Sequence, residues 1–254
     1  MIYYLYFYGF KIRKMLENIT LSKVLFLDIE TVPAYSSYEQ LNERLKKLWN
    51  RKTQNILRSD YSFDGEKTPE AVYERAGIYA EFGKIICIST GFISENSFRI
   101  KSFYGKDEKT ILINFSEMLN KYFNTPSHFL CAHNGKEFDY PYIARRILIN
   151  GIKLPKLLDI AGKKPWEITH LDTMELWKFG DYKSYTSLEL LTAIFDIPTP
   201  KNDIDGSQVR NVYYEENDLE RIVTYCQKDT LAVAQILLKY RGEEIIKEEN
   251  IIYA

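Results

Sequence analysis

The feature that most constrains the fold is a carboxylate on an apolar helical face near the C-terminus. Hydrophobic spacing predicts a long final helix over roughly residues 218–240. At about 100° per residue, Asp229 lies in the middle of a narrow apolar sector. The other residues of that sector are Ile222, Cys226, Val233 and Ile236. Because an isolated buried charge is very costly, Asp229 has to be paired or bound to a metal ion.

Tyr225 lies one turn before Asp229, on the same face of the expected helix. A tyrosine hydroxyl beside a buried carboxylate can take part in chemistry. The ordinary alternative is a core aromatic next to a salt-bridged aspartate. Both interpretations stay open from these two residues alone.

Two more carboxylates lie at the end of an apolar run. Val24–Leu27 reads as a central strand buried on both faces, and Asp28-Ile29-Glu30 follows it. Strand alternation points Asp28 and Glu30 to the same side. A solvated strand end would look the same, so this pair alone is a weak signal.

Asp139 follows the short apolar run Phe129–Ala132 and opens an expected helix over residues 140–150. An aspartate that opens a helix is commonly a cap or a partner of the helix dipole. If the four carboxylates converge, however, each close pair repels by roughly 4 kcal/mol at 4 Å and an effective dielectric near 20. No matching set of cationic side chains accompanies these segments, which favours hard divalent cations with oxygen ligands, Mg²⁺ or Mn²⁺.

Composition sets wider limits on the function. The chain has 254 residues, with 34 basic and 35 acidic side chains, so it carries no global basic field that would gather nucleic acid. Cys87, Cys131 and Cys226 show no metal-ligand spacing, which fits a reducing cytoplasm. The apolar start, residues 1–10, is too short to span a bilayer, and no membrane association is expected.

The pattern of apolar runs predicts an α/β domain. Strands are expected at Lys84–Thr90, Ser97–Phe103 and Ile168–Leu171, and helices at Lys109–Phe123 and Ser187–Phe195. We expect one domain over residues 15–254 with a helical insertion at about 36–81. Residues 1–14 are interpreted as a disordered tail or a start-site artefact.

Three motifs in order resemble the DEDD superfamily of 3'-5' exonucleases: Asp28-Ile29-Glu30, Asn134-x-x-x-Phe138-Asp139 and Tyr225-x-x-x-Asp229. Tyr225 indicates the tyrosine type, because Thr224 stands where the histidine type carries its histidine. Four further segments are similar to a stand-alone bacterial family related to the exonuclease domain of family B DNA polymerases. They are Phe82–Ser89, His170–Asp172, Tyr185–Leu191 and Asp205–Val209.

The resemblance implies a ribonuclease H-like fold, with a mixed central sheet that has one antiparallel strand and with flanking helices. It also implies two divalent cations held by Asp28, Glu30, Asp139 and Asp229, and a water oriented by Tyr225. Nucleoside 5'-monophosphates would be the products. The implied substrate contacts are Thr31, Asn134 and Phe138. Lys183 is a weaker candidate for a phosphate contact, because a solvated lysine is the commoner explanation of such a residue.

Three functional hypotheses follow from the resemblance. Single-stranded DNA 3' ends are the favoured substrate, because the resemblance is to DNA polymerase domains. An exoribonuclease would use the same carboxylates, since discrimination rests on the pocket around the sugar. A catalytically silent module that binds nucleic-acid ends is the third hypothesis, and protein partners are not predicted.

Overall fold

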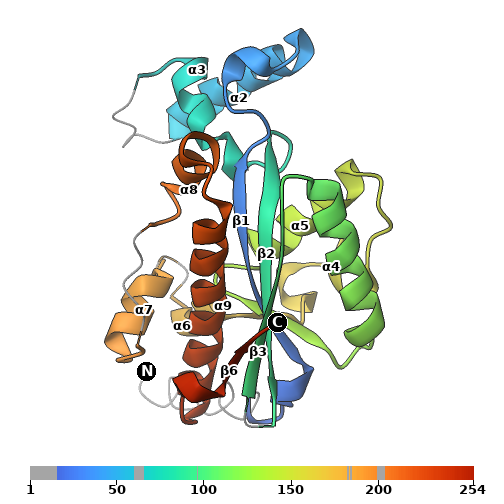
Figure 1. Cartoon of the computed structure of the whole chain (residues 1–254), viewed down its shortest axis with the longest axis vertical. Helices are drawn as coiled ribbons and strands as arrows, with labels where there is room; N and C mark the ends of the chain where they lie inside the picture. Colours follow the sequence, from blue (N-terminus) through green and yellow to red (C-terminus); the bar gives the residue numbers. More distant parts are fainter. Residues whose placement is uncertain (1–15, 60–65, 96, 182, 184, 199–203) are drawn as a thin grey trace.

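A central sheet lies between two layers of helices in the computed structural model (Figure 1), which describes residues 16–59, 66–95, 97–181, 183, 185–198 and 204–254. The strands are β1 (Val24–Pro33), β2 (Gly83–Ser94), β3 (Ser97–Tyr104), β4 (Phe129–Ala132), β5 (Leu171–Asp172) and β6 (Ile251–Tyr253). Their order is β5-β4-β1-β2-β3-β6. The interpretation of residues 1–14 falls outside the described residues.

The strand directions confirm the expected fold class. β2 runs antiparallel to both β1 and β3, while the β1–β4, β4–β5 and β3–β6 pairs are parallel. One antiparallel strand therefore lies in an otherwise parallel mixed sheet, as in the ribonuclease H-like fold. The expected burial of β1 on both faces is also observed, since Val24–Leu27 are buried.

Alternation along β1 divides the core into two layers. Leu25, Leu27 and Ile29 pack with α4 and α5 on one face. Val24 and Phe26 pack with α9 on the other face. The α-helices are α2 (Glu43–Ser59), α3 (Pro69–Val72), α4 (Glu108–Tyr122), α5 (Asp139–Ile149), α6 (Thr173–Lys178), α7 (Leu188–Ile194), α8 (Val209–Asn211) and α9 (Leu219–Arg241).

Local signals set the ends of α9 close to the expected limits. The Asp218 side chain accepts a hydrogen bond from the backbone N–H of Arg221 and so caps the first turn. Gly242 ends the helix at φ 72°, a left-handed conformation that glycine adopts without strain.

Three local expectations were wrong in detail. β5 is only Leu171–Asp172, because the Asp172 side chain immediately caps α6. α7 begins at Leu188 rather than at the expected Ser187, whose hydroxyl caps the helix by accepting from the backbone N–H of Leu190. The edge strand β6 was not expected, because three residues are too short to show a period.

The segment expected to be a helical insertion contains α2, α3 and the 3₁₀ helix η3 (Tyr73–Ile78). Trp49 of α2 is fully buried, packs edge-on against Tyr73 and Phe82, and donates its indole N–H to the Pro69 carbonyl at 2.7 Å. These contacts form a satellite core beyond the end of β1 (Figure 1).

Membrane insertion finds no support in the described part of the chain. None of its helices combines the length and the apolar character needed to cross a bilayer.

Candidate metal centre

β1 presents Asp28 and Glu30 to the face covered by α9. They alternate with Ile29, which points into the opposite core layer. The register with β2 shifts between Glu30 and Thr31, whose partners are Cys87 and Ile85, and this marks a β-bulge. Bulges re-aim side chains and are common next to functional sites. The two carboxylates thus lie at an irregular point of the central strand.

Beside these carboxylates, the edge of β1 that faces β4 has no strand partner in the described part of the chain. β4 pairs with β1 only along Val24–Phe26 and then ends at Ala132. The chain returns to this edge at the start of α5, where Asp139 is 4% exposed. The backbone N–H of Ile29 is close enough to the Asp139 carboxylate to lower its pKa, against the larger effect of burial. Asp139 is the first residue of α5, and its side chain faces β1. The N-cap position belongs to Phe138.

α9 carries the remaining two residues, Tyr225 and Asp229, one turn apart. The Tyr225 hydroxyl interacts with the Asp229 carboxylate, and the negative charge of Asp229 acts on both Asp28 and Glu30. The helix is fixed to β1 by the Cys226 thiol, which donates to the Asp28 carbonyl at 3.4 Å. The ligand atoms of Asp28, Glu30 and Cys226 lie within 4.8 Å of one another.

The pKa shifts show how closely the carboxylates gather. Burial raises the pKa values of Asp28 and Glu30 well above their usual range, and the nearby negative charge of Asp229 adds to the rise in both. Burial raises the pKa of Asp139 to about 7 and that of Asp229 to about 6. Burial and the charge of Asp229 also raise the pKa of Tyr225, whose hydroxyl stays protonated.

The acidic cluster of Asp28, Glu30, Asp139 and Asp229 lacks cationic partners. No ion pair within 4.0 Å reaches any of the four among the residues that the structure describes. Glu30 is only 7% exposed, and in the same part of the chain its carboxylate accepts no hydrogen bond. Buried charges of this kind are normally paired or bound to metal, and oxygen ligands suit Mg²⁺ or Mn²⁺.

Cys226 was not expected near the ligand atoms, because its helical position also fits an apolar core residue. Burial raises its pKa well above the usual value, and the nearby thiol of Cys87 adds to this rise. Cys226 is therefore a neutral hydrogen-bond donor to β1 rather than a thiolate ligand.

The loop before Asp139 is held by a residue to which the sequence assigned no role. Asp172 is 3% exposed and accepts hydrogen bonds from the backbone N–H groups of Asn134 and Lys136, both at 3.0 Å. It also accepts from the first turn of α6. Asn134 has a left-handed backbone conformation with φ 62°, so the direction of its side chain depends on how this loop is held. The segment His170–Asp172 resembles the exonuclease family, but the resemblance alone did not indicate that Asp172 holds this loop.

The expected substrate-contact residues have different surroundings. Asn134 and Phe138 are half-buried in the loop before α5, where the Phe138 ring packs against Tyr142 at 5.3 Å. Thr31 is half-buried near the Tyr142 hydroxyl, which donates to the Gly77 carbonyl at 2.6 Å. Lys183 is exposed, and its backbone N–H donates to Asp181.

Half-buried His133 and buried His170 hold loops in place. Nε2–H of His133 donates to the Thr186 carbonyl, and its Nδ1 lies 2.9 Å from the Thr173 hydroxyl. His170 donates from Nε2 to the Leu157 carbonyl and accepts the Leu130 backbone N–H at Nδ1. Burial lowers the pKa of His170 to about 4, so this ring is neutral. Both nitrogens of each ring are occupied, which leaves neither ring free as a base.

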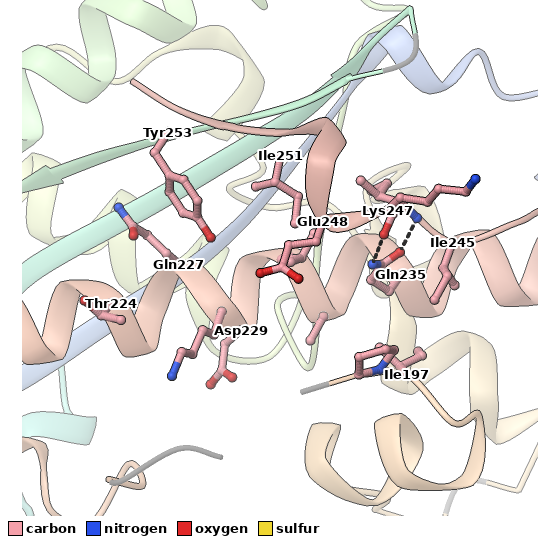
Figure 2. A pocket seen from close by; sticks show the side chains of 15 residues that line it. Ile197, Thr224, Gln227, Asp229, Gln235, Ile245, Lys247, Glu248, Ile251 and Tyr253 are labelled. Atoms are coloured by element: carbon pink, nitrogen blue, oxygen red, sulfur yellow. Dashed lines mark hydrogen bonds between the residues drawn. The ribbon is translucent and has the colours of Figure 1, made fainter. Parts of the chain in front are cut away.

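A groove of about 720 Å³ lies on the outer side of α9, and Asp229 is at its margin. Figure 2 shows Asp229 and Tyr253 on opposite sides of the helix, with the segment from Ile245 to Tyr253 forming one wall. Gln235 fixes this wall by two hydrogen bonds to the Ile246 backbone, at 2.7 and 2.9 Å. Of the four carboxylates of the acidic cluster, Asp229 lines the groove and the other three do not.

A comparison with known families gives the arrangement its context. A family model described as a predicted 3'-5' exonuclease related to the exonuclease domain of PolB matches residues 78–245. The match includes Asp139, Tyr225 and Asp229, while Asp28 and Glu30 precede it. Because it covers more than half of the chain, it supports a nuclease function. This protein belongs to the family of predicted 3'-5' exonucleases related to the exonuclease domain of PolB.

Proposed function

We propose that this chain is a two-metal-ion 3'-5' exonuclease that hydrolyses single-stranded DNA from its 3' end and releases nucleoside 5'-monophosphates. The observation that carries the proposal is the acidic cluster. Of its four carboxylates, Glu30 and Asp139 are buried and Asp28 and Asp229 are half-buried, and none forms an ion pair in the described part of the chain. At neutral pH, bound cations would offset the repulsion among these carboxylates.

In this proposal, Asp28, Glu30 and Asp229 would hold the first cation, and Asp28 and Asp139 would hold the second. Bound Mg²⁺ or Mn²⁺ would offset the charge of the carboxylates and the phosphate and would acidify the attacking water. The protonated Tyr225 hydroxyl, one turn from Asp229, would orient that water beside the phosphate.

Thr31, Asn134 and Phe138 are proposed to contact the terminal nucleotide. Phe138 offers a half-buried ring on which a base can stack, and the loop that carries Asn134 is held by Asp172. Lys183 is proposed as a phosphate contact because it is exposed. Three cysteines that are all free fit the cytoplasmic location expected from the sequence, which stays a prediction.

The test is stepwise shortening of a 5'-labelled single-stranded oligonucleotide, run in parallel on DNA and RNA of the same sequence. We expect a ladder of products with Mg²⁺ or Mn²⁺, no products with EDTA, and faster shortening of the DNA. Faster shortening of the RNA would instead identify an exoribonuclease that uses the same carboxylates.

The double variant Asp28→Ala plus Asp229→Ala tests the assigned residues. We expect it to fold and to lose activity. Full activity of this variant would refute the site, whereas an inactive wild-type protein that still binds labelled 3' ends would support a silent binding module.

A further inference from the structure

Helix α2 carries a stripe of positive charge on its solvent face. The helix contains six basic residues and one acidic residue, Glu43, which pairs with Lys46 at 3.2 Å. Because the whole chain has 34 basic and 35 acidic residues, the remainder of the protein is net negative. The basic residues of α2 are therefore concentrated locally, because the rest of the chain has no excess of basic residues.

Helical spacing places four of these side chains in one row. On a helix of about 3.6 residues per turn they fall within roughly 60° of one another, opposite Trp49 and Ile56. The basic stripe consists of Arg44, Lys47, Arg51 and Arg58, all of which are exposed. None of the four has an ion pair or a hydrogen bond within the described ranges.

The satellite core fixes the orientation of the stripe. Trp49 is 0% exposed, and the rings of Tyr73, Tyr79 and Phe82 surround it at 5.0 to 6.1 Å between centroids. With this face buried, the opposite face has to point to solvent. On an ordinary solvent-exposed helix face, basic side chains can be scattered. Four unpaired cations in one row instead form a surface that matches a chain of phosphates.

The stripe lies beyond the end of β1 that follows the acidic cluster. Ala34 donates its backbone N–H to the carbonyl of Phe82, and Phe82 in turn contacts Trp49 of α2. The distance from Glu30 to the end of β1 is about 10 Å at 3.3 Å per residue, and a helix is about 10 Å across. The stripe is thus about 20 Å from the carboxylates, or about six stacked nucleotides at 3.4 Å each.

We propose that the basic stripe binds the phosphate backbone of the single-stranded substrate several nucleotides away from the 3' end. This inference rests on the proposed nuclease function and adds the surface that holds the strand. The matched family region begins only at residue 78, so α2 lies outside it. The stripe is about 20 Å long, from the rise of 1.5 Å per residue, and can follow several phosphates.

The experiment compares the triple variant Arg44→Gln, Lys47→Gln and Arg51→Gln with wild type on a long oligonucleotide and on a dinucleotide. For an oligonucleotide of about 25 nucleotides, we expect KM to rise at least about tenfold at 0.1 M salt with kcat unchanged. The slope of log affinity against log salt should fall by about 2, from roughly 0.7 per lost phosphate contact. Dinucleotide hydrolysis should not change, because a dinucleotide cannot reach α2.

The matched control replaces three exposed lysines of α4 and of the loop just before it, with Lys106→Gln, Lys109→Gln and Lys121→Gln. It has the same change of charge and should keep the wild-type KM and salt slope. Equal KM and salt slope in the two triple variants would overturn the proposal. So would wild-type binding to phosphatidylserine vesicles combined with an unchanged oligonucleotide KM in the α2 variant, because α2 would then be a membrane-surface helix.

Binding separates this proposal from the proposed chemistry. Anisotropy of a labelled oligonucleotide in EDTA, with Asp229→Ala in every protein, needs no catalysis and still reports the loss of affinity. If wild type proves inactive on all substrates, the nuclease proposal fails and the binding comparison still decides the role of the stripe. If circular dichroism shows that the triple variant loses helix, the three single substitutions serve, each lowering the salt slope by about 0.7.

Discussion

Two buried carboxylate regions of this protein are built in opposite ways. Glu108 of α4 accepts both arms of the Arg146 guanidinium, at 2.5 and 2.8 Å, as well as the backbone N–H of Ile85 and the side-chain amide of Asn150. Glu30, buried to the same degree, accepts no hydrogen bond in the described part of the chain and lies beside like charges. The fold thus supplies partners for a structural carboxylate and leaves the acidic cluster open for cations from solution.

The largest effect is expected from breaking the satisfied region. Arg146→Met leaves Glu108 buried without its cation, and we expect a loss of about 3–5 kcal/mol in the free energy of unfolding. Urea unfolding followed by circular dichroism measures it. Adding Glu108→Gln should recover part of the loss, and a change below about 1 kcal/mol would mean that the pair is not essential to stability.

In the acidic cluster, removing a charge should raise stability, whereas removing Arg146 from its ion pair with Glu108 should lower it. Asp229→Asn is expected to lower nuclease activity by about 10²–10³-fold, the range for losing one electrostatic element of a site. In EDTA it should raise the free energy of unfolding by about 1 kcal/mol, because repulsion within the cluster is relieved.

Oligonucleotide shortening and thermal unfolding of the same preparation check both halves of this prediction. The matched control is Asp159→Asn at an exposed position, which should change neither quantity. Lower stability of Asp229→Asn without metal would contradict a repulsive cluster.

Stability should also depend on pH through the cluster. The pKa values of Asp139 and Asp229 are raised to about 7 and about 6, so between about pH 4 and 7 the folded state binds more protons than the unfolded state. The free energy of unfolding without metal should therefore fall as the pH rises through this window.

Added Mg²⁺ or Mn²⁺ at pH 8 should restore stability by about 2.7 kcal/mol at a concentration of 100 times Kd. The measurement is thermal unfolding in EDTA and in metal across this pH range. The double variant Asp139→Asn plus Asp229→Asn should flatten the pH dependence. The same slope in this variant would place its origin elsewhere in the protein.

The smallest effect is expected at the tyrosine. Tyr225→Phe removes the hydroxyl proposed to orient the water but no charge, so we expect about a tenfold fall in kcat, equivalent to one hydrogen bond of about 1.4 kcal/mol. Metal binding, measured by calorimetry, should stay within a few-fold of wild type. Unchanged kcat would remove only the orienting role of Tyr225.

The sequence was most informative where a local pattern depends on only one element. The apolar run into Asp28 and the period and approximate limits of α9 each follow from residues within a few turns, because strand and helix geometry repeat locally. The mixed sheet with one antiparallel strand also followed, through the resemblance. The position of Asp229 on the helix indicated that its charge needs a partner.

What the sequence alone could not give is which groups meet through space. The hydrogen bond from Cys226 to β1, the hold of Asp172 on the loop of Asn134, and the pairing of Glu108 with Arg146 join residues 36 to 198 positions apart. Burial and like-charge repulsion depend on those contacts, and they set the pKa values. The sequence by itself determined which carboxylates the chain carries and on which elements; the tertiary structure decided which of them find partners within the chain.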